Sequence, residues 1–550
     1  MSDSLGNRWL KLLPRLSGYQ HYDPRLLYFW VQIRLLSPHL SHGGRLDLPS
    51  AKTPPHARPS RVLGFRDLFL FYVVTGISLR WIATAAGHGP SSLVIWLGGW
   101  LFLYVPLALS VIHLSSRFPT EGGFYVWTKK ALGERAGFLS AWMYWVSNLP
   151  YFPAVLYFAA SNLLFLHPAL QRYSQRPVYF AVFSVVVLAG LTTLNILGLN
   201  LAKWAHNLGA IAMWAPVLIV IILGVLSWRG FGSATPFTPQ SFIPTAHVQD
   251  MFFWSIVIFS FIGCESASLM GDEIKDTRRN IPPALLFAGL TVAICYMLGT
   301  FCVLLAIPST ESSNLDGLAQ AIAHTASRLQ IRGITEIGTF LIAISNIGAA
   351  GAYLAAAARL PFVAGLDGYL PAVFGELHPR FKTPWVSILG QGGFGIFFVF
   401  LGQAGASVGN AYVLLAATAV LITMVPFALL FVAMIRLQNR VHFPDDPDPD
   451  SLSSGSGIRS FFALTALPPL TCILLGSVGF CTAVFAIGLS LIPPIEEPHK
   501  LLYFLKLIGS SVAFAALGLF LFQLGRGRTY LQEDASAKEE NQDFFAGGGG

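Results

Sequence analysis

The sequence predicts an all-α integral membrane protein with twelve transmembrane helices. Three observations lead to this fold class: an apolar composition, a series of long apolar runs, and an uneven distribution of basic residues. Of the 550 residues, 54% are hydrophobic and only 11% are charged, and the mean hydropathy is +0.60. Soluble domains contain roughly 25% charged residues. The excess of apolar surface must therefore face lipid.

Twelve apolar runs reach the length of a spanning helix, which is about 20 residues. The predicted spans are, in chain order, residues 66–88, 91–114, 137–165, 178–198, 204–228, 251–270, 284–307, 334–364, 385–402, 409–436, 460–491 and 501–524. Several contain glycine or proline, which a membrane helix tolerates where neighbouring helices or a cavity satisfy the freed backbone groups.

Basic residues between the spans predict the orientation. If the N-terminus is cytoplasmic, most of the 35 Lys and Arg residues fall in cytoplasmic segments, as the positive-inside rule requires. We therefore expect both termini in the cytoplasm. The first long apolar run begins only near Leu68, which is too deep for a cleavable signal sequence.

The remaining segments complete the predicted organisation. Leu26–Leu36 is apolar but too short to span, so it either lies on the membrane surface or belongs to a disordered extension. Residues 445–457 are acidic and then Ser/Gly-rich, which predicts a flexible linker. The predicted units are a cytoplasmic tail (1–62), a first five-helix repeat (63–228), a second repeat (251–437), spans 11 and 12 (458–524) and a second cytoplasmic tail (525–550).

Motif content argues against several functional classes. The five cysteines lie in apolar stretches without a CxxC or Cys/His pattern, which indicates buried thiols and no metal site. The net charge of +8 does not indicate nucleic-acid binding, because the basic residues lie between apolar runs. An HExxH motif is missing, which argues against a zinc-dependent hydrolase. A GxxxxGK[ST] phosphate loop is missing too, which argues against ATP-driven transport.

Two spans carry a glycine at mid-length followed closely by a charge. Span 1 contains Thr75–Trp81 (TGISLRW), and span 6 contains Phe259–Ser266 (FSFIGCES). If these helices unwind at Gly76 and Gly263, their half-helix ends offer partial charges to the carboxylate and the ammonium of an amino acid. Each broken span would open a set of five helices, which is typical of an inverted repeat. The alternative is that both glycines only permit close helix packing.

Three ionisable side chains lie within spans, where such residues are costly and usually functional. Arg80 could bind an anionic group of a substrate, pair with Glu265, or extend outward to the interface. Glu265 could carry a proton, bind a substrate ammonium, hold a gate or form a structural ion pair. Arg359 is near the cytoplasmic end of span 8, so we expect it at a gate or a helix interface.

Four stretches resemble motifs of one known family, in the same order along the chain. They are Glu121–Trp127 (EGGFYVW), Phe259–Glu265 (FSFIGCE), Glu273–Pro282 (EIKDTRRNIP) and Asp367–Pro371 (DGYLP). With them, residues 62–440 resemble the amino acid–polyamine–organocation permeases, and most closely the bacterial branch that includes glutamate/γ-aminobutyrate antiporters.

The resemblance implies a five-plus-five inverted repeat, two extra C-terminal helices, and a substrate held at both breaks. It implies that the substrate carboxylate contacts Thr75, Gly76, Ile77 and Ser78. It implies that the ammonium and side chain meet Ser260, Phe261 and Gly263, with Cys264 and Glu265 beside them. Topology alone adds Tyr144, Asn148 and Asn346. Gating or folding roles are expected for Glu121, Gly122, Gly123, Glu273, Arg359 and Asp367.

Span 1 departs from the family pattern. Many relatives have a small-residue run such as GxG there, whereas this chain has only Gly76, followed by Arg80 and Trp81. A substrate with an extra negative group, or a longer ω-amino acid, becomes plausible. Span 5 has no lysine at mid-length, because Lys203 lies at its start, so the coupling ion stays open.

These observations together predict a secondary transporter for amino acids or related amino and carboxylate compounds. We expect it to work by alternating access as an antiporter or a proton-coupled symporter in the plasma (inner) membrane. The expected partners are a small-molecule substrate, the lipid bilayer, and a coupling proton or counter-substrate, with no cofactor and no nucleic acid. Two alternatives remain: a sensor that keeps a transporter fold, and a polyamine or organocation permease.

Overall fold

The computed structural model describes residues 61–245, 248–309, 317–402, 408–438, 467–492 and 500–546. Within these residues the chain is helical and forms no strand; Leu63 and Ile274 make an isolated parallel bridge. The predicted surface segment Leu26–Leu36 and the predicted linker 445–457 lie outside the described residues.

The first half of the described chain follows the predicted spans closely. Its helices are α2 (Phe65–Gly76), α3 (Leu79–Gly87), α4 (Ser91–Gly99), the π-helix η1 (Trp100–Tyr104), α5 (Val105–Arg117), α6 (Phe124–Leu132), α7 (Glu134–Leu163), η2 (Leu164–Leu166), η3 (Pro168–Tyr173), α8 (Pro177–Leu197), α9 (Leu199–Phe231) and η4 (Pro239–Phe242).

The second half contains the other broken span. Its helices are α10 (Val248–Phe259), η5 (Ser266–Glu273), α11 (Thr277–Ala306), α12 (Gly317–Arg328), α13 (Ile334–Ala357), α14 (Arg359–Leu366), η7 (Ala372–Gly375), α15 (Trp385–Gly402), α16 (Val408–Leu437), α18 (Pro469–Ser490) and α19 (Lys500–Ala546).

Ten helical segments of the described chain are long and apolar enough to cross a membrane. Two predicted spans fall short of that length. Residues 251–270 are divided between α10 and η5, and the apolar part of α15 is only Trp385–Phe400. An all-helical membrane protein is therefore confirmed, whereas the number twelve and the inverted repeat stay predictions.

Local sequence explains where neighbouring helices are separated. Gly133 lies between α6 and α7 with φ 90°, and Gly198 lies between α8 and α9 with φ 130°. These are backbone conformations that side chains with a Cβ rarely adopt. Asp276 caps α11, because its carboxylate accepts a 3.1 Å hydrogen bond from the Arg279 backbone N–H.

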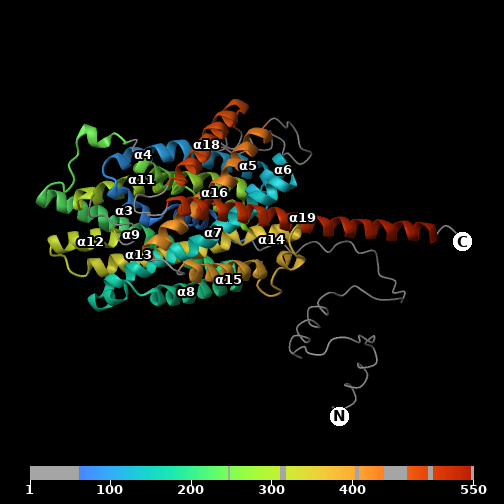
Figure 1. The fold of residues 1–550 in the computed structure, drawn as a ribbon, viewed down its shortest axis with the longest axis horizontal. Helices are drawn as coiled ribbons and strands as arrows, with labels where there is room; N and C mark the ends of the chain where they lie inside the picture. The colour runs from blue at the N-terminus through green and yellow to red at the C-terminus, as the bar shows by residue number, and fades with distance from the viewer. Residues whose placement is uncertain are drawn as a thin grey trace, which may run out of the picture. The chain divides into compact units, whose positions relative to one another are not determined.

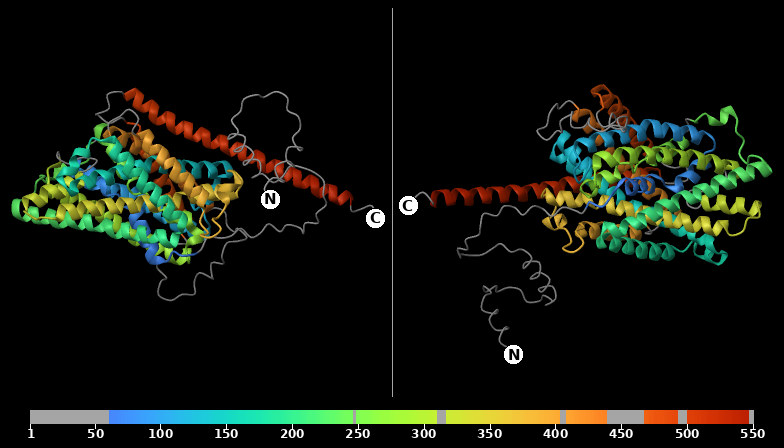
Figure 2. Two further views of the ribbon diagram at one scale, coloured as in Figure 1. Left: turned by 90° about the horizontal axis from the view of Figure 1, so that it is seen from below. Right: turned by 180° about the vertical axis from the view of Figure 1, so that it is seen from behind.

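Helices α2 and α3 lie inside the bundle, packed mainly against α9, α11 and α13. Figure 1 shows the helices of the bundle, with α8 and α15 side by side along one edge. Figure 2 shows the blue segment of α2 and α3 among the green and yellow helices. The buried position of span 1 is what gives its broken segment many protein partners.

One contact between glycines brings two of these helices together. A Cβ on Gly209 in α9 would lie 2.7 Å from the Cα of Gly348 in α13. Only glycine at both positions allows backbones to approach this closely. This glycine pair therefore sets how closely α9 and α13 approach.

Helix α19 differs from the predicted end of span 12. It continues to Ala546, whereas the prediction placed a tail after residue 524. The segment from Thr529 to Ala546 contains no glycine or proline and includes three Glu, three Ala and two Gln, which favour helix. Polarity alone therefore did not mark the helix end.

Candidate functional site

Span 1 is broken where the sequence predicted it. Helix α2 ends at Gly76, and α3 begins at Leu79. Between them Ile77 has φ −100° and ψ 131°, and Ser78 has φ −128° and ψ 107°, which are extended conformations. Two residues of extended backbone therefore interrupt a membrane helix.

Span 6 is broken at the matching place. Helix α10 ends at Phe259 and η5 begins at Ser266, with Gly263 at φ 119° between them. A Cβ on Gly263 would lie 2.4 Å from the backbone oxygen of Thr75. The two breaks are therefore in direct contact, and Gly263 is the residue that permits the contact.

Side chains replace the hydrogen bonds that the breaks leave unmade. The Tyr296 hydroxyl accepts from the Ser78 N–H at 2.8 Å and lies 3.1 Å from the carbonyl oxygens of both Gly76 and Ser260. The Tyr353 hydroxyl donates to the Thr75 carbonyl at 2.8 Å. Such replacement is required where backbone is unwound inside a membrane.

Tyr296→Phe is expected to lower the melting temperature of the purified protein. The change leaves Gly76, Ser78 and Ser260 backbone groups without this partner, at a cost of about 1–3 kcal/mol for buried polar groups. Tyr104→Phe is the matched control, because its buried hydroxyl makes one bond of 2.9 Å, to the Leu285 carbonyl. Equal melting temperatures for the two variants would contradict the bridging role of Tyr296.

A cavity lies between the two breaks. Its free interior is about 40 Å³, and its wall combines hydroxyl, amide and aromatic side chains with one guanidinium. The residues that line it are Thr75, Gly76, Ser78, Arg80, Trp81, Tyr144, Ser147, Asn148, Tyr151, Phe259, Ser260, Ile262, Tyr353 and Thr423. Polar groups from both breaks therefore face one small space.

Seven of the residues proposed from sequence for substrate binding lie on this wall: Thr75, Gly76, Ser78, Arg80, Tyr144, Asn148 and Ser260. Six others do not line it: Ile77, Phe261, Gly263, Cys264, Glu265 and Asn346. The structure thus brings residues of both breaks together on one wall and leaves out six predicted residues, among them the polar Glu265 and Asn346.

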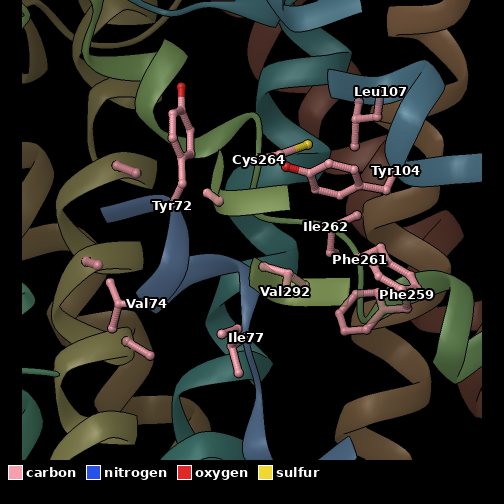
Figure 3. Close-up of a cluster of buried hydrophobic side chains, with 14 of the residues drawn as sticks. Tyr72, Val74, Ile77, Tyr104, Leu107, Phe259, Phe261, Ile262, Cys264 and Val292 are labelled. Atoms are coloured by element: carbon pink, nitrogen blue, oxygen red, sulfur yellow. The ribbon is translucent and has the colours of Figure 1, made fainter. Parts of the chain in front are cut away.

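Several of the six residues that do not line the cavity contact other parts of the protein instead. The Phe261 ring packs edge-on against Trp96 and Tyr296, with centroid distances of 5.5 Å each. Figure 3 shows Ile77, Phe261 and Cys264 within this buried cluster, with the Cys264 sulfur beside the Tyr104 hydroxyl. Asn346 donates to the Ile342 carbonyl of its own helix at 2.7 Å. These positions fit packing better than contact with a solute.

Glu265 lies immediately behind the cavity wall and is fully buried. Its Oε1 accepts a 2.7 Å hydrogen bond from the Tyr144 hydroxyl, and its Oε2 accepts a 2.9 Å bond from the Gly263 N–H. Within the described chain these are its hydrogen-bond partners, so the suggested pair with Arg80 is not formed. Tyr144 therefore connects the carboxylate to the cavity.

Arg80 lies on the cavity wall and is only 2% exposed. Its guanidinium carbon is 4.2 Å from the centroid of the Trp81 ring and 5.6 Å from that of Tyr151. Stacking on aromatic faces is a favourable environment for a guanidinium away from water. The outward-extending alternative does not fit this burial.

The motif residues meet at a second place, which we name the charge cluster: Glu121, Glu273 and Arg359. The Arg359 Nη2 lies 2.7 Å and 3.1 Å from the two carboxylate oxygens of Glu273, and Nε lies 3.9 Å from Glu121. All three side chains are buried. Burial, and then the neighbouring Glu273, raise the pKa of Glu121 well above its ordinary value.

The loop that carries Glu121 packs directly against the second half of span 6. The Glu121 carboxylate accepts a 3.0 Å hydrogen bond from the Asp272 N–H, and the Gly122 N–H donates to Leu269 at 3.0 Å. Gly123, with φ 45°, would place a Cβ 2.8 Å from the Ser268 backbone oxygen. The two glycines thus allow a close backbone contact between loop and half-helix.

Asp367 belongs to a separate pair at the end of α14. Its Oδ2 lies 2.8 Å from the Lys129 ammonium and accepts a hydrogen bond from the Tyr125 hydroxyl. The predicted motif residues therefore form one buried charge cluster and one partly exposed ion pair, and none of the six lines the cavity. Gating and folding roles remain proposals for all of them.

Sequence reasoning missed several residues of the site. Trp81, Ser147, Tyr151, Phe259, Ile262, Tyr353 and Thr423 complete the cavity wall. Ser147 and Tyr151 follow the predicted Tyr144 and Asn148 at helical spacing, so that periodicity could have identified them. Tyr353, Thr423 and the bridging Tyr296 carry no local signal. Among the described residues, no cluster of His, Cys, Asp and Glu could hold a metal ion.

Comparisons with known proteins show which family of proteins the chain is similar to. Residues 63–513 match the family model described as amino acid permease. An uncharacterised transporter of Legionella pneumophila is 25% identical over 461 residues, covering 82% of this chain and 95% of the relative. A probable agmatine/putrescine antiporter of Lactococcus lactis is 24% identical over 392 residues, covering 71% of this chain and 82% of the relative. An uncharacterised transporter of Mycobacterium bovis is 27% identical over 287 residues, covering 50% of this chain and 59% of the relative.

Proposed function

Because the chain belongs to the amino acid permease family, we propose that it is a secondary active transporter for amino acids or related amino and carboxylate compounds. The observation that carries the proposal is the cavity on which both helix breaks converge. Broken half-helices that meet at mid-membrane are the usual substrate site of such transporters. Alternating access would expose this cavity to each side in turn.

The polar wall supports a small zwitterionic or anionic solute. At the span 1 break the Ser78 hydroxyl is buried without a hydrogen-bond partner among the described residues, and it lies at the N-terminus of α3. The positive end of a helix favours a carboxylate. At the span 6 side, Ser260 and Asn148 offer oxygen atoms to an ammonium group. We assign the carboxylate to the first break and the ammonium to the second.

Glu265 is our candidate for coupling transport to protons. Its carboxylate contacts the cavity only through Tyr144, so a change in its protonation would reach a bound solute through one hydrogen bond. Uptake driven by an imposed proton gradient would support symport. Uptake that depends only on an opposing solute gradient would support antiport and would contradict the proton-carrying role of Glu265.

The charge cluster is our candidate for the cytoplasmic gate. It joins the loop before α6, the end of η5 and the start of α14. The bridge between Leu63 and Ile274 adds the segment before α2. The basic residues predict cytoplasmic termini, and the family resemblance implies the inner membrane. With that orientation, this cluster would close the inner side of the transport path.

A screen of purified protein with a panel of ligands tests the proposed function. The panel contains amino acids, ω-amino acids, polyamines and dicarboxylates, measured by thermal shift at two pH values and then by uptake into proteoliposomes. A ligand at 100 times its Kd stabilises the folded state by about 2.7 kcal/mol. We expect at least one ligand to raise the melting temperature and to be taken up.

The variant Gly76→Leu tests, in the same screen, whether the ligand binds at the span 1 break. A Cβ on Gly76 would already lie 3.1 Å from Val292, so a leucine must project into the cavity wall or displace the break. We expect folded protein without a ligand-induced shift. Binding without uptake in the unaltered protein would favour the sensor alternative, and a preference for polyamines would favour the organocation permease.

A further inference from the structure

We propose that Arg80 is an anion-binding residue of this cavity and that the preferred substrate is a solute with net negative charge, such as an acidic amino acid or a dicarboxylate. The inference rests on the proposed function, and it narrows the substrate class. One carboxylate would meet the span 1 break, and a second would meet the Arg80 guanidinium.

The position of Arg80 makes it available to a solute. It belongs to α3, two residues after the break, and it lies on the cavity wall. The rings of Trp81 and Tyr151 lie along its guanidinium, 4.2 Å and 5.6 Å away. The planar fork of a guanidinium matches the two oxygens of a carboxylate, so a carboxylate in the cavity would meet a complementary group on its wall.

The second intramembrane arginine provides a comparison within the molecule. Arg359 is equally buried, at 1% exposure against 2% for Arg80, but it is held by the Glu273 carboxylate through three hydrogen bonds and does not line the cavity. Of these two buried arginines, Arg80 is therefore the one whose side chain borders the space in which a substrate would lie.

The charge of the wall selects the sign of the ligand. Of the residues that line the cavity in the described chain, Arg80 alone carries a formal charge. The nearby Glu265 carboxylate is turned to Tyr144 and Gly263. Charges interact strongly where water is scarce. Such a wall attracts a carboxylate and repels a dication, so polyamines are expected to bind poorly here.

Pairs of ligands matched in size but not in charge test the proposal. Affinities for glutamate and glutamine, and for aspartate and asparagine, would be measured with succinate and putrescine by thermal shift and isothermal titration calorimetry. For the unaltered protein we expect the acid of the better-binding pair to bind roughly 10-fold more tightly than its amide, or better. Putrescine should bind more weakly than the acid.

Substitutions of Arg80 then test whether this residue causes the preference for the acid over its amide. Arg80→Gln should weaken binding of the acid by roughly 10- to 100-fold and change binding of the amide by less than about 3-fold, so that the preference disappears. Arg80→Lys should restore part of the preference, because it keeps the charge but loses the planar fork. Size-exclusion profiles confirm that each variant is folded.

Three results would overturn the inference. The first is that an amide or putrescine binds the unaltered protein as tightly as the acid does. This result needs no variant, so it overturns the inference even if Arg80→Gln fails to fold, and it leaves the proposed transporter function intact. An acid preference that survives in folded Arg80→Gln assigns the anion site elsewhere. Absence of binding and uptake across the whole panel overturns the proposed function as well.

Discussion

Gly263→Ala is expected to abolish substrate binding and uptake. Gly263 has φ 119°, a conformation that costs a residue with a Cβ about 1–3 kcal/mol. The added methyl group would lie 2.4 Å from the Thr75 carbonyl oxygen and 2.8 Å from the Tyr353 hydroxyl. Both breaks must then move apart. Ligand-induced thermal shift and proteoliposome uptake would measure the loss.

Gly198→Ala is the matched control for this prediction. Gly198 has φ 130°, and a Cβ there would meet nothing within 4 Å. It therefore imposes a similar backbone strain without a collision, and we expect binding and uptake to be retained. If the two variants lose activity to the same extent, backbone strain alone explains the result, and the contact between the breaks is not the important feature.

Arg359→Met is expected to be the most destabilising substitution in the charge cluster. It leaves the Glu273 carboxylate buried without its partner, and breaking a buried ion pair in this way costs about 3–5 kcal/mol. We expect a much lower melting temperature and little folded protein. Combining it with Glu273→Leu should recover part of the loss, because the double variant no longer buries that carboxylate.

Glu121→Gln is the matched control in the same cluster. Burial and Glu273 raise the pKa of Glu121, which favours its neutral form, and glutamine resembles that form in size and polarity. The hydrogen bond from the Asp272 N–H can be kept by an amide oxygen. We expect a small change in melting temperature. A loss as large as that of Arg359→Met would show that Glu121 must be ionised in the cluster.

Most of the helices could be predicted from the sequence, because the bilayer imposes a simple requirement on composition and length. The predicted spans 178–198 and 284–307, for example, match α8 and α11 within a few residues, apart from an earlier start of α11. Helix α11 starts earlier, at Thr277, and contains Pro282 and Pro283 within it. The family resemblance drawn from four motifs is confirmed by the amino acid permease match.

The breaks were predictable for the same kind of reason. A glycine at mid-span followed by a charge is a local pattern, and both spans are interrupted within two residues of the predicted position. The assignment of individual residues to substrate contact stays a prediction. Alternation along an extended segment turns Ile77 away from the cavity while Gly76 and Ser78 line it, whereas the family resemblance did not distinguish among the three.

Residues from distant helices could not be placed from the sequence at all. Tyr296 and Tyr353 hold the backbone of both breaks, yet each lies in an apolar helix where a tyrosine has many possible roles. Their function depends on which helix packs beside the break, and no local pattern reports that. The same holds for Arg359, whose partners are 86 residues away at Glu273 and in the Glu121 loop.

By itself, the sequence determined that this chain is a helical membrane protein of the permease type, with two interrupted spans and a charge near each. These properties follow from local composition, since lipid selects apolar helices and glycine weakens them. Only the tertiary structure decided which of these charges lies on the cavity wall. Arg80 lines the cavity, whereas Glu265 bonds Tyr144 behind the wall and Arg359 bonds Glu273 elsewhere, because the packing of distant helices fixes which groups each charge can reach.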